Sequence, residues 1–424
     1  MGRLHVIGAG LSGLGAAVRA AELGAQVSLY DQSPQAGGRA RSYHDKHLGC
    51  DIDNGNHLMM AGNWAAMWLM DTIGAQQERI CPDRAIFPFM DVESGKRWNI
   101  EFNEGRLPKW VFHKNRRVPG TKALDYLPLA LMLFAGPEDT VADYVPEGHP
   151  LYASLMEPLC VAVVNASPED SSAQLLAAVI KETVFRGATP SRPVISRNGL
   201  SATFAKPALD YLKSYGADVQ LGQRVSDFQF EQGVLRSFDV GGAKIELGYD
   251  DMAILAVPPA TAKKLVPDLE VPAGSSPILN VHFKLNEDVE TNWPAPFMGL
   301  VNAVAQWVFV RGNIASVTIS AADALIDMDA DAIGALVWAD VAKTLDMQSS
   351  PVPPVRVVKE KRATFLQTPE NVKKRPNMVT AYANLLLAGD WTQTELPATI
   401  EGSVRSGYKA ADRAVKIIKQ QPFE

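Results

Sequence analysis

Apolar and polar positions divide the first 42 residues into a strand, a helix and a second strand. Leu4 to Ile7 is a short apolar run of the kind that forms a buried strand. A turn interrupted by glycines follows, and then a segment of small residues that ends at Gly24 and predicts a helix. The second apolar run, Gln26 to Tyr30, leads directly into Asp31. The pattern predicts a strand–helix–strand unit, the building block of a parallel sheet.

Beyond residue 42, some segments repeat their apolar residues at the spacing of a helix and others at the spacing of a strand. Helices are predicted over residues 63–74, 124–134, 151–164, 172–184, 200–215, 330–345 and 400–418. Strands are predicted within 84–120, over 216–221, as hairpins between 224 and 247, and over 251–257, 278–285, 305–311, 314–320 and 384–388.

The buried strands predicted at 251–257 and 384–388 are expected to join the sheet of the N-terminal unit. We therefore expect an α/β fold in which a Rossmann-like nucleotide-binding domain is assembled from separate segments and interleaved with an α+β substrate-binding domain. The expected segments are 1–62, 200–260 and 381–424 for the first domain, and 63–199 and 261–380 for the second.

Composition limits the class of protein. The 424 residues are 47% hydrophobic and 21% charged, which describes a globular chain with room for two or three domains or for one domain with an insertion. The net charge is −6 and no long basic run offsets it, so we expect no nucleic-acid partner. The three cysteines, Cys50, Cys81 and Cys160, are scattered, which suits a reducing compartment and predicts no metal site.

The first predicted strand begins at about residue 3, so no targeting segment is expected before it. The longest nearly uncharged stretch is Tyr126 to Gly136, far shorter than the roughly 20 residues that span a bilayer. We expect a cytoplasmic protein, either free or peripheral on the inner face of the cytoplasmic membrane. Residues 123–136 are then its membrane-contacting segment, although a buried core helix explains the same residues equally well.

The glycines of the N-terminal unit occupy the positions that a dinucleotide requires. Gly8 makes the tight turn, Gly10 allows the pyrophosphate to approach the backbone, and Gly13 allows the helix to pack closely on the strand. The helix N-terminus favours the phosphate charge. Asp31 ends the second strand, where it can accept hydrogen bonds from the adenosine ribose.

Two further stretches favour FAD over NAD. Gly37, Gly38 and Arg39 form a second, cationic turn that is similar to the glycine–glycine–arginine extension of FAD enzymes in the amine oxidase and carotenoid desaturase superfamily. Near the C-terminus, a strand ending in Gly389-Asp390 places a carboxylate at the sheet edge where ligands bind. The helix that begins near Thr399 and Ile400 presents free amides, which are suited to the flavin O2.

The chain resembles the squalene-associated FAD-dependent desaturases along nearly its whole length. The shared stretches are GAGLSGLGAA, PQAGGRARS, DNGNHL, MEPLCVAVVNASPEDSSA, SRNGLSATF, SPILNVHF, AQWVFVRG, VVKEKRATFLQTPE and LLLAGDWTQTELPATIEGSVRSGYKAA. The resemblance implies an FAD-binding domain of the GR2 type, with Val225 contacting the adenine through its backbone. The FAD-binding residues so predicted are Gly8, Gly10, Ser12, Gly13, Asp31, Gln32, Gly38, Arg39, Val225, Gly389, Asp390, Thr399 and Ile400.

The implied reaction is the reductive dehydroxylation of hydroxysqualene to squalene, in squalene and hopanoid biosynthesis. It requires an acid for the departing hydroxyl, an apolar channel and a rigidly held flavin. His57 is our first candidate for the acid, and Asn56 for holding the hydroxyl; alternatively, His57 and Asp53 merely brace their loop. Because no second glycine-rich unit for a nicotinamide is visible, electrons are expected from an external donor. Neighbouring squalene-pathway enzymes are possible partners.

Three other functions are weighed against this one. A flavin amine oxidase typically has an aromatic residue just before the residue that caps the flavin, and Thr399 stands there instead. A carotenoid-type polyene desaturase shares fold and substrate class but uses the flavin in the oxidative direction. A non-catalytic prenyl-binding escort is disfavoured by the intact glycines and by Asp31 and Asp390.

Overall fold

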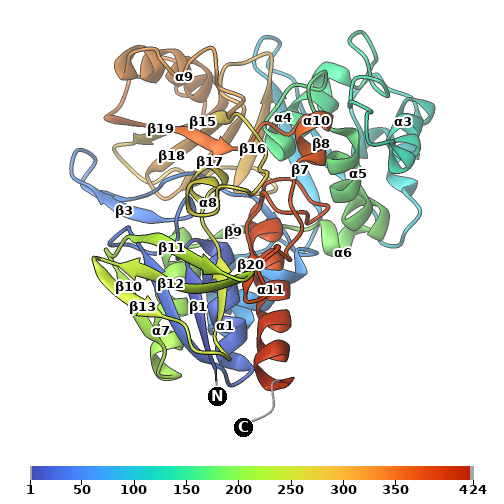
Figure 1. The fold of residues 1–424 in the computed structure, drawn as a ribbon. Helices are drawn as coiled ribbons and strands as arrows, with labels where there is room; N and C mark the ends of the chain where they lie inside the picture. Colours follow the sequence, from blue (N-terminus) through green and yellow to red (C-terminus); the bar gives the residue numbers. More distant parts are fainter. Residues whose placement is uncertain (1, 421–424) are drawn as a thin grey trace.

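A computed structural model describes residues 2–420, and a five-stranded parallel sheet forms the lower part of the molecule (Figure 1). Its order is β10 (Asp218–Leu221), β2 (Gln26–Asp31), β1 (Arg3–Ile7), β14 (Met252–Leu255) and β20 (Leu385–Leu387). All four strand pairs are parallel. Three distant stretches of sequence therefore end their strands at one sheet edge.

Two helices from opposite ends of the chain pack side by side on this sheet. They are α1 (Leu11–Glu22) and α11 (Ile400–Gln420). Glycine makes the approach possible, because a Cβ at Gly407 would overlap the carbonyl oxygen of Ser12, and one at Gly15 would lie 3.2 Å from Val404. The helices α2 (Trp64–Thr72) and α7 (Lys206–Ser214) join the same apolar core. Small residues at the helix crossing thus bring the last helix beside the first.

A three-stranded antiparallel sheet covers the opposite face. It consists of β11 (Val225–Glu231), β12 (Val234–Val240) and β13 (Ala243–Glu246). Its inward Phe238 packs with Tyr30 of the parallel sheet and with Trp391. The parallel sheet is therefore buried on both faces, which explains its continuous apolar strands.

A seven-stranded sheet forms the upper part of the molecule (Figure 1). Its order is β19 (Val355–Thr364), β15 (Ser276–Lys284), β18 (Ile314–Ser320), β17 (Trp307–Arg311), β16 (Phe297–Val301), β7 (Ile86–Asp91) and β8 (Arg97–Glu101). One face packs on α9 (Ala330–Thr344), where Phe283 meets Trp338 with ring centres 5.1 Å apart. Because side chains alternate along a strand, the other face carries a different set of residues.

The remaining elements connect these layers. The helices α3 (Leu127–Leu131), α4 (Glu157–Val164), α5 (Ala173–Glu182) and α6 (Ala188–Ser191) form a lobe beside the seven-stranded sheet. The other elements are the hairpin β3 (Ser42–Asp45)–β4 (Cys50–Asp53), the small strands β5 (Met59–Met60), β6 (Arg79–Ile80) and β9 (Pro193–Ser196), and the short helices α8 (Pro259–Leu265) and α10 (Pro369–Lys373). Among residues 2–420, no helix is both long and apolar enough to cross a membrane.

Several predicted elements need correction. The strand pattern within 84–120 ends at Glu101, and residues 109–116 form short 3-10 helices in which Trp110 is buried. Residues 124–134 form only a short α-helix flanked by 3-10 turns, and residues 151–164 begin with a π-helical turn. The strands β16 and β19 were not predicted. β19 is an edge strand rich in charged residues, a composition that protects an exposed edge and hides the strand pattern.

Candidate functional site

The glycine loop lies between β1 and α1 and leaves an open cradle at Gly10. Gly8 has φ +111° and donates its N–H to the carbonyl oxygen of Tyr30 at 2.7 Å. A Cβ at Gly13 would overlap the carbonyl oxygen of Gly8, so helix and turn touch backbone to backbone. Gly10 differs, because a Cβ there would meet nothing within 4 Å. The loop is packed tightly on one side and open on the other.

The N-terminus of α1 is free to bind an anion. Gly10 precedes the helix without a capping side chain, and the first turn holds no acidic residue. The hydroxyl of Ser12 lies 3.2 Å from that of Ser406, which in turn accepts the N–H of Gly389 at 2.8 Å. The Ser12 side chain is thus engaged inside the protein, and its backbone amide is the group that faces the helix end. Unpaired N–H groups at a helix start attract phosphate.

Asp31 is held at the rim of this loop. Its carboxylate accepts the N–H of Ala9 at 2.6 Å and that of Ser33 at 2.7 Å, while further lone pairs remain for ribose hydroxyls. The carbonyl oxygen of Asp31 also accepts the N–H of Gln223 at 2.8 Å, which brings the start of β11 at Val225 near the carboxylate. Gln32 is exposed.

The second glycine turn lies directly on the first. Gly37 donates its N–H to Ala9 at 2.8 Å and bridges to Gly10, and a Cβ on Gly38 would lie 3.2 Å from the Gly10 Cα. Both Gly37 and Gly38 have positive φ, +106° and +59°. This turn aims Arg39 across the site: its Nη2 lies 2.8 Å from both carboxylate oxygens of Asp390, and its Nη1 donates to the carbonyl oxygen of Ala363.

The Arg39–Asp390 ion pair joins the N-terminal and C-terminal motifs. Asp390 is 7% exposed and raises the pKa of the Arg39 guanidinium, whose side chain is 41% exposed. Gly389 has φ +152°, and a side chain there would collide with the indole of Trp391. The carboxylate is therefore fixed at the carboxyl end of β20, the sheet edge where ligands of such folds bind.

The loop from Asp390 to α11 is fixed by a residue that the sequence analysis missed. Arg375 is buried and donates to the carbonyl oxygens of Leu396 (2.8 Å) and Asp390 (2.9 Å) and to the hydroxyl of Thr394 (2.7 Å). Burial lowers the pKa of its guanidinium to about 10. The Thr399 hydroxyl accepts the N–H of Gly402 at 3.1 Å and so caps α11 just before Ile400. A lone arginine in the sequence gives no sign of this role.

A second missed cluster fixes the start of α11. Glu401 is 3% exposed and accepts the N–H groups of Ala65 (3.2 Å) and Ala66 (2.9 Å), which begin α2. Arg405 bridges Glu401 and Glu182 at 2.7 Å each, and both carboxylates raise its pKa. These contacts hold the N-terminal turn of α11 in a defined position.

The Asp53–His57 turn connects the glycine loop to the seven-stranded sheet. Asp53 accepts the Ser42 hydroxyl at 2.6 Å and the N–H of Leu200 at 2.9 Å. Asn56 donates its side-chain N–H to the hydroxyl of Thr318 at 3.2 Å. His57 is half-buried, and burial lowers the pKa of its imidazole to about 4, against an opposing effect of Asp53.

The sheet face that meets this turn is polar on one half. Asn280 lies opposite Thr318 on β15 and β18, and its amide oxygen accepts the Thr318 hydroxyl at 2.9 Å. The same amide binds the backbone of the turn, donating to Asn54 at 3.1 Å and accepting from Asn56 at 3.3 Å. Two positions further along β15, His282 shares its Nδ1 with the Ser316 hydroxyl at 2.8 Å.

The other half of the same face is aromatic. Trp307 pairs with Thr318 across β17 and β18, so the two halves meet there. The ring centres of Phe297 and Phe309 lie 6.0 Å apart, and those of Phe89 and Trp307 lie 5.5 Å apart. The indole N–H of Trp307 is buried without a partner within residues 2–420. This face therefore combines hydrogen-bonding groups with an apolar aromatic surface.

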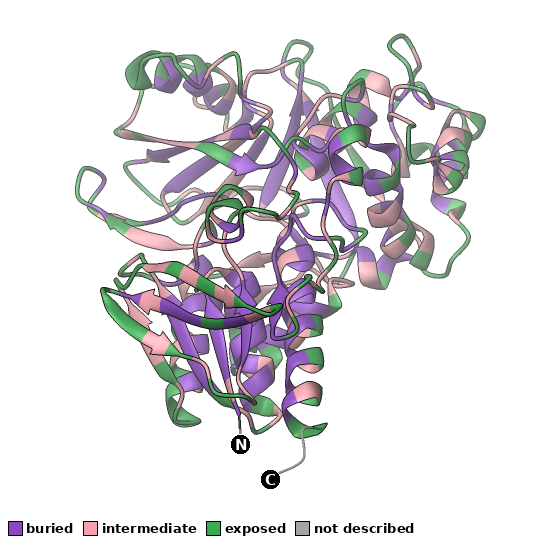
Figure 2. Ribbon diagram, in the orientation of Figure 1, coloured by how far each residue is buried: buried purple, intermediate pink, exposed green. Residues whose placement is uncertain are grey.

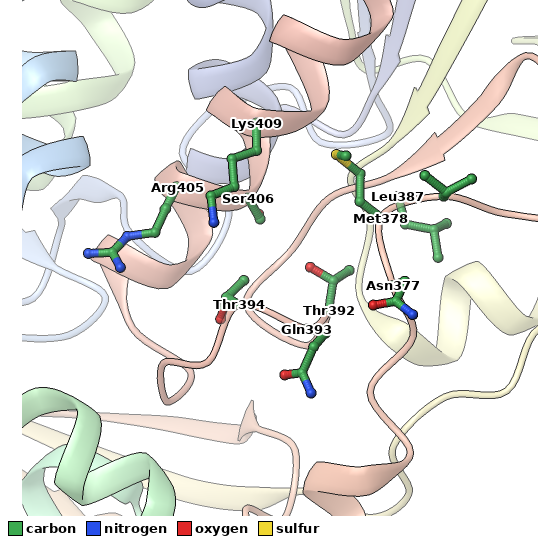
Figure 3. A pocket seen from close by; sticks show the side chains of 10 residues that line it. Asn377, Met378, Leu387, Thr392, Gln393, Thr394, Arg405, Ser406 and Lys409 are labelled. Atoms are coloured by element: carbon green, nitrogen blue, oxygen red, sulfur yellow. The ribbon is translucent and has the colours of Figure 1, made fainter. Parts of the chain in front are cut away.

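A separate pocket of about 430 Å³ lies outside β20, between α11 and the segments 377–379 and 392–394 (Figure 3). Seven of its ten lining residues are polar, among them Lys409, Gln393 and Ser406. None of the predicted FAD-binding residues lines it, so it is distinct from the glycine cradle. In the part of the chain that the structure describes, no group of histidine, cysteine and acidic residues is arranged to hold a metal ion.

The cradle fits a dinucleotide on its own geometry. An open space at Gly10, an uncapped helix N-terminus and a carboxylate at the strand end supply the contacts that pyrophosphate and ribose require. This arrangement defines a dinucleotide-dependent oxidoreductase fold.

Comparison with known proteins specifies the class. Residues 11–415 match the model of the flavin containing amine oxidoreductases, and the chain belongs to this family of FAD-dependent oxidoreductases. It is 42% identical to hydroxysqualene dehydroxylase of Sinorhizobium fredii over 97% of this chain and 98% of that one. It is also 42% identical to hydroxysqualene dehydroxylase of Rhodopseudomonas palustris over 96% and 97% of the two chains.

Among solved structures, cyclohexylamine oxidase of Brevibacterium oxydans superposes with a TM-score of 0.69, covering 99% of both chains at 14% identity. At that identity the likeness supports the fold. The predicted α/β fold and FAD cofactor are thereby confirmed.

Proposed function

We propose that this chain is an FAD-dependent hydroxysqualene dehydroxylase, which replaces the allylic hydroxyl of a polyisoprenoid by hydrogen. The observation that carries the proposal is the divided face of the seven-stranded sheet beside the Asp53–His57 turn. Its polar half can hold a hydroxyl, and its aromatic half can hold an isoprenoid chain. The 42% identity to two hydroxysqualene dehydroxylases supports the same assignment.

When bound and reduced, FAD would supply the hydride and the proton with which hydroxysqualene gives squalene and water. The cofactor would be held by the glycine cradle, Asp31, Arg39 and the amides before Ile400. The rest of the work falls to this chain's own residues: they place the carbon–oxygen bond, exclude water and stabilise the departing hydroxyl.

The substrate hydroxyl would lie where the polar and aromatic halves meet. Asn56 and Thr318 present hydrogen-bonding groups there, and the unpartnered indole N–H of Trp307 lacks an acceptor that a hydroxyl would provide. The aromatic surface would exclude water from the reacting carbon. Thr318 keeps its position because it is hydrogen-bonded to both Asn56 and Asn280. A fixed Thr318 would in turn orient the carbon–oxygen bond of the substrate.

His57 would act as a neutral hydrogen-bonding group. With a pKa of about 4, its imidazole is uncharged at neutral pH, so the imidazolium form that the sequence analysis assigned as the acid is scarcely populated. A neutral imidazole still offers one donor and one acceptor to the hydroxyl. Its role would then be to orient the leaving group beside Asn56.

An anaerobic single-turnover experiment tests the proposal. Purified enzyme with its FAD pre-reduced is mixed with hydroxysqualene, and flavin absorbance and extracted products are followed. We expect flavin reoxidation and formation of squalene in equal amounts. The proposal is wrong if neither occurs while squalene or another polyene reduces the oxidised flavin, because that result identifies a desaturase.

Electrons for repeated turnover would come from an external donor. The sequence carries a single glycine-rich nucleotide motif, so the chain offers no place of that type for a nicotinamide. We expect NADH or NADPH alone to leave the flavin oxidised, and a separate reductase or small redox protein to reduce it. Direct and rapid reduction by a nicotinamide would contradict this expectation.

A further inference from the structure

The helical lobe beside the seven-stranded sheet exposes an unusual number of large apolar side chains. Among residues 2–420, fourteen large hydrophobic residues are exposed, and six of them fall between positions 107 and 134: Leu107 (71% exposed), Phe112 (72%), Leu124 (79%), Leu127 (54%), Leu131 (52%) and Phe134 (86%). We call these six residues the apolar patch. Soluble surfaces rarely gather such residues, and a gathering of this kind marks an interaction surface.

Part of the patch lies on one side of a helical segment. Leu124, Leu127, Leu131 and Phe134 are spaced by three, four and three residues, which places them on one face. Tyr126, Leu129 and Met132 are buried on the opposite face. The segment is thus apolar on both sides, and the outward side has no protein to pack against among the described residues. The α3 helix lies at the outer edge of the molecule, where Figure 2 shows exposed and intermediate residues.

Leu107 and Phe112 flank a second piece of the patch. The 3-10 helix between them buries Trp110, whose ring lies 5.0 Å from that of Tyr126 in an edge-to-face contact. This contact fixes the two pieces against each other through their buried sides. Their exposed residues therefore belong to one lobe and do not depend on a mobile loop.

Cations outnumber acids in the segment that carries the apolar patch. Residues 105–134 contain six lysines and arginines and one acidic residue, Asp125, although the whole chain carries a net charge of −6. They are Arg106, Lys109, Lys114, Arg116, Arg117 and Lys122. Apolar residues interrupt this series, which is why the sequence showed no long basic run. Arg116 lies 3.6 Å from Glu101, which also pairs with Arg84, whereas Lys109 and Lys114 have no salt bridge within residues 2–420.

Aromatic packing links the patch to the proposed substrate face. Trp110 contacts Phe102 (5.2 Å between ring centres), Phe102 contacts Phe87 (5.6 Å), and Phe87 contacts Phe297 (6.0 Å). Phe297 belongs to the aromatic half of the sheet face described above. These rings belong to one packed core, so the patch and the proposed substrate face are parts of the same rigid unit.

We infer that the apolar patch and the cations of the same segment form a membrane-docking surface for a bilayer with anionic headgroups. The apolar side chains insert below the headgroups, and the lysines and arginines bind the surface charge. The inference commits to a lipid surface because the segment 105–134, with six cations, one acid and exposed leucine and phenylalanine, complements anionic lipid. The proposed function only explains why docking is useful, and the surface is testable without any turnover.

Vesicle binding by the FAD-loaded protein tests the inference. Sedimentation is measured with vesicles of phosphatidylcholine alone and of phosphatidylcholine mixed with phosphatidylglycerol. We expect binding to the mixed vesicles that weakens with salt. The double variant Leu124→Ser/Phe134→Ser removes two highly exposed side chains without touching the core. We expect each lost side chain to weaken the affinity for vesicles about tenfold or more. The variant Lys109→Glu/Lys114→Glu should lose binding to the mixed vesicles.

Tyr249→Ser is the matched control, since Tyr249 is 84% exposed but lies in the loop between β13 and β14. It should bind vesicles as the unaltered protein does. The inference is overturned if the patch variants bind like this control, or if the patch instead mediates self-association that light scattering detects and Leu124→Ser/Phe134→Ser abolishes. Single-turnover dehydroxylation in detergent should be the same in all variants, so a failure of the proposed reaction is seen separately.

Discussion

The guanidinium of Arg39 lies 2.8 Å from both carboxylate oxygens of Asp390, although 351 positions separate the two residues. Each residue ends a motif: Arg39 follows the second glycine turn, and Asp390 follows the last strand of the parallel sheet. The pair therefore joins the two ends of the chain at the edge where FAD is expected to bind. The guanidinium is also held at two points, because Nη2 contacts both oxygens of Asp390 while Nη1 donates to the carbonyl oxygen of Ala363.

Asp390→Asn should weaken both the fold and FAD binding. Asp390 is buried, so removing its negative charge leaves the positive charge of Arg39 without a counter-ion. Because the Arg39 side chain is 41% exposed, solvent limits the loss, and we expect the free energy of unfolding to fall by about 1–2 kcal/mol. Urea denaturation and FAD retention on gel filtration measure the two effects. Asp71→Asn, in the more exposed Arg79–Asp71 pair, should change neither.

Two alanine substitutions should separate the packing role of the glycine loop from its binding role. A Cβ at position 13 would overlap the Gly8 carbonyl, so Gly13→Ala should destabilise the apoprotein severely or prevent folding. Gly10 has φ −70° and ψ 176°, which alanine adopts, and open space beside it. Gly10→Ala should therefore leave the apoprotein melting temperature unchanged and weaken FAD binding at least about tenfold.

The measurements are thermal melting of the apoprotein and FAD titration by flavin fluorescence. Normal FAD affinity in Gly10→Ala would show that the pyrophosphate does not approach this residue. A folded, stable Gly13→Ala apoprotein would contradict the packing described for α1.

Buried histidines should make the protein less stable in mild acid. Burial lowers the pKa of His282 to about 4, below the roughly 6.5 of an unfolded histidine. Between those values the unfolded chain binds more protons, so stability is lost as pH falls from about 6.5 towards 4. For this one group the loss between pH 7.5 and pH 5 is about 2 kcal/mol.

The variant His282→Asn tests the contribution of His282 to this loss of stability. The asparagine amide can keep the hydrogen bond to Ser316 but does not titrate. Urea denaturation at the two pH values should show a loss smaller by about 2 kcal/mol than in the unaltered protein. His57 contributes a loss of the same sign in both proteins. An unchanged pH dependence would mean that burial does not lower the pKa of His282 in the folded protein.

The nucleotide half of the protein was predictable because local chemistry dictates it. Gly8, Gly13 and Gly38 stand where the backbone needs positive φ or close contact, and such demands leave a mark in the sequence. The Arg375 contacts and the Glu401–Arg405 cluster were not predictable, since their partners lie on other elements. Their geometry follows from tertiary packing, which periodicity does not encode.

The substrate half shows the same limit. The alternation of β15 and β18 predicted strands, but which face meets the Asp53–His57 turn depends on sheet order. The environment of His57 was not predictable either, because burial lowers the pKa of its imidazole to about 4 and burial depends on tertiary packing. Sequence alone supplied the residue type and not its environment.

Thr318→Val should uncouple positioning from binding at the proposed substrate site. The Thr318 hydroxyl accepts from Asn56 and donates to Asn280, so valine leaves the Asn56 side-chain N–H without this partner, at a cost of about 1–3 kcal/mol if it stays buried, while Asn280 keeps its contacts to the backbone of the turn. Asn56 then loses the contact that orients it, while the aromatic half that would bind the chain is unchanged. We expect kcat for dehydroxylation to fall about tenfold or more and KM to change little.

Thr318→Ser, which keeps the hydroxyl, should restore kcat and serves as the control. Phe309→Ala should show the opposite split, with a raised KM, because it removes apolar contact area from the substrate face. Stopped-flow single turnover with pre-reduced enzyme separates the chemical step from binding. Equal effects of Thr318→Val and Phe309→Ala on kcat and KM would mean that the two halves of the sheet face do not divide hydroxyl and chain as proposed.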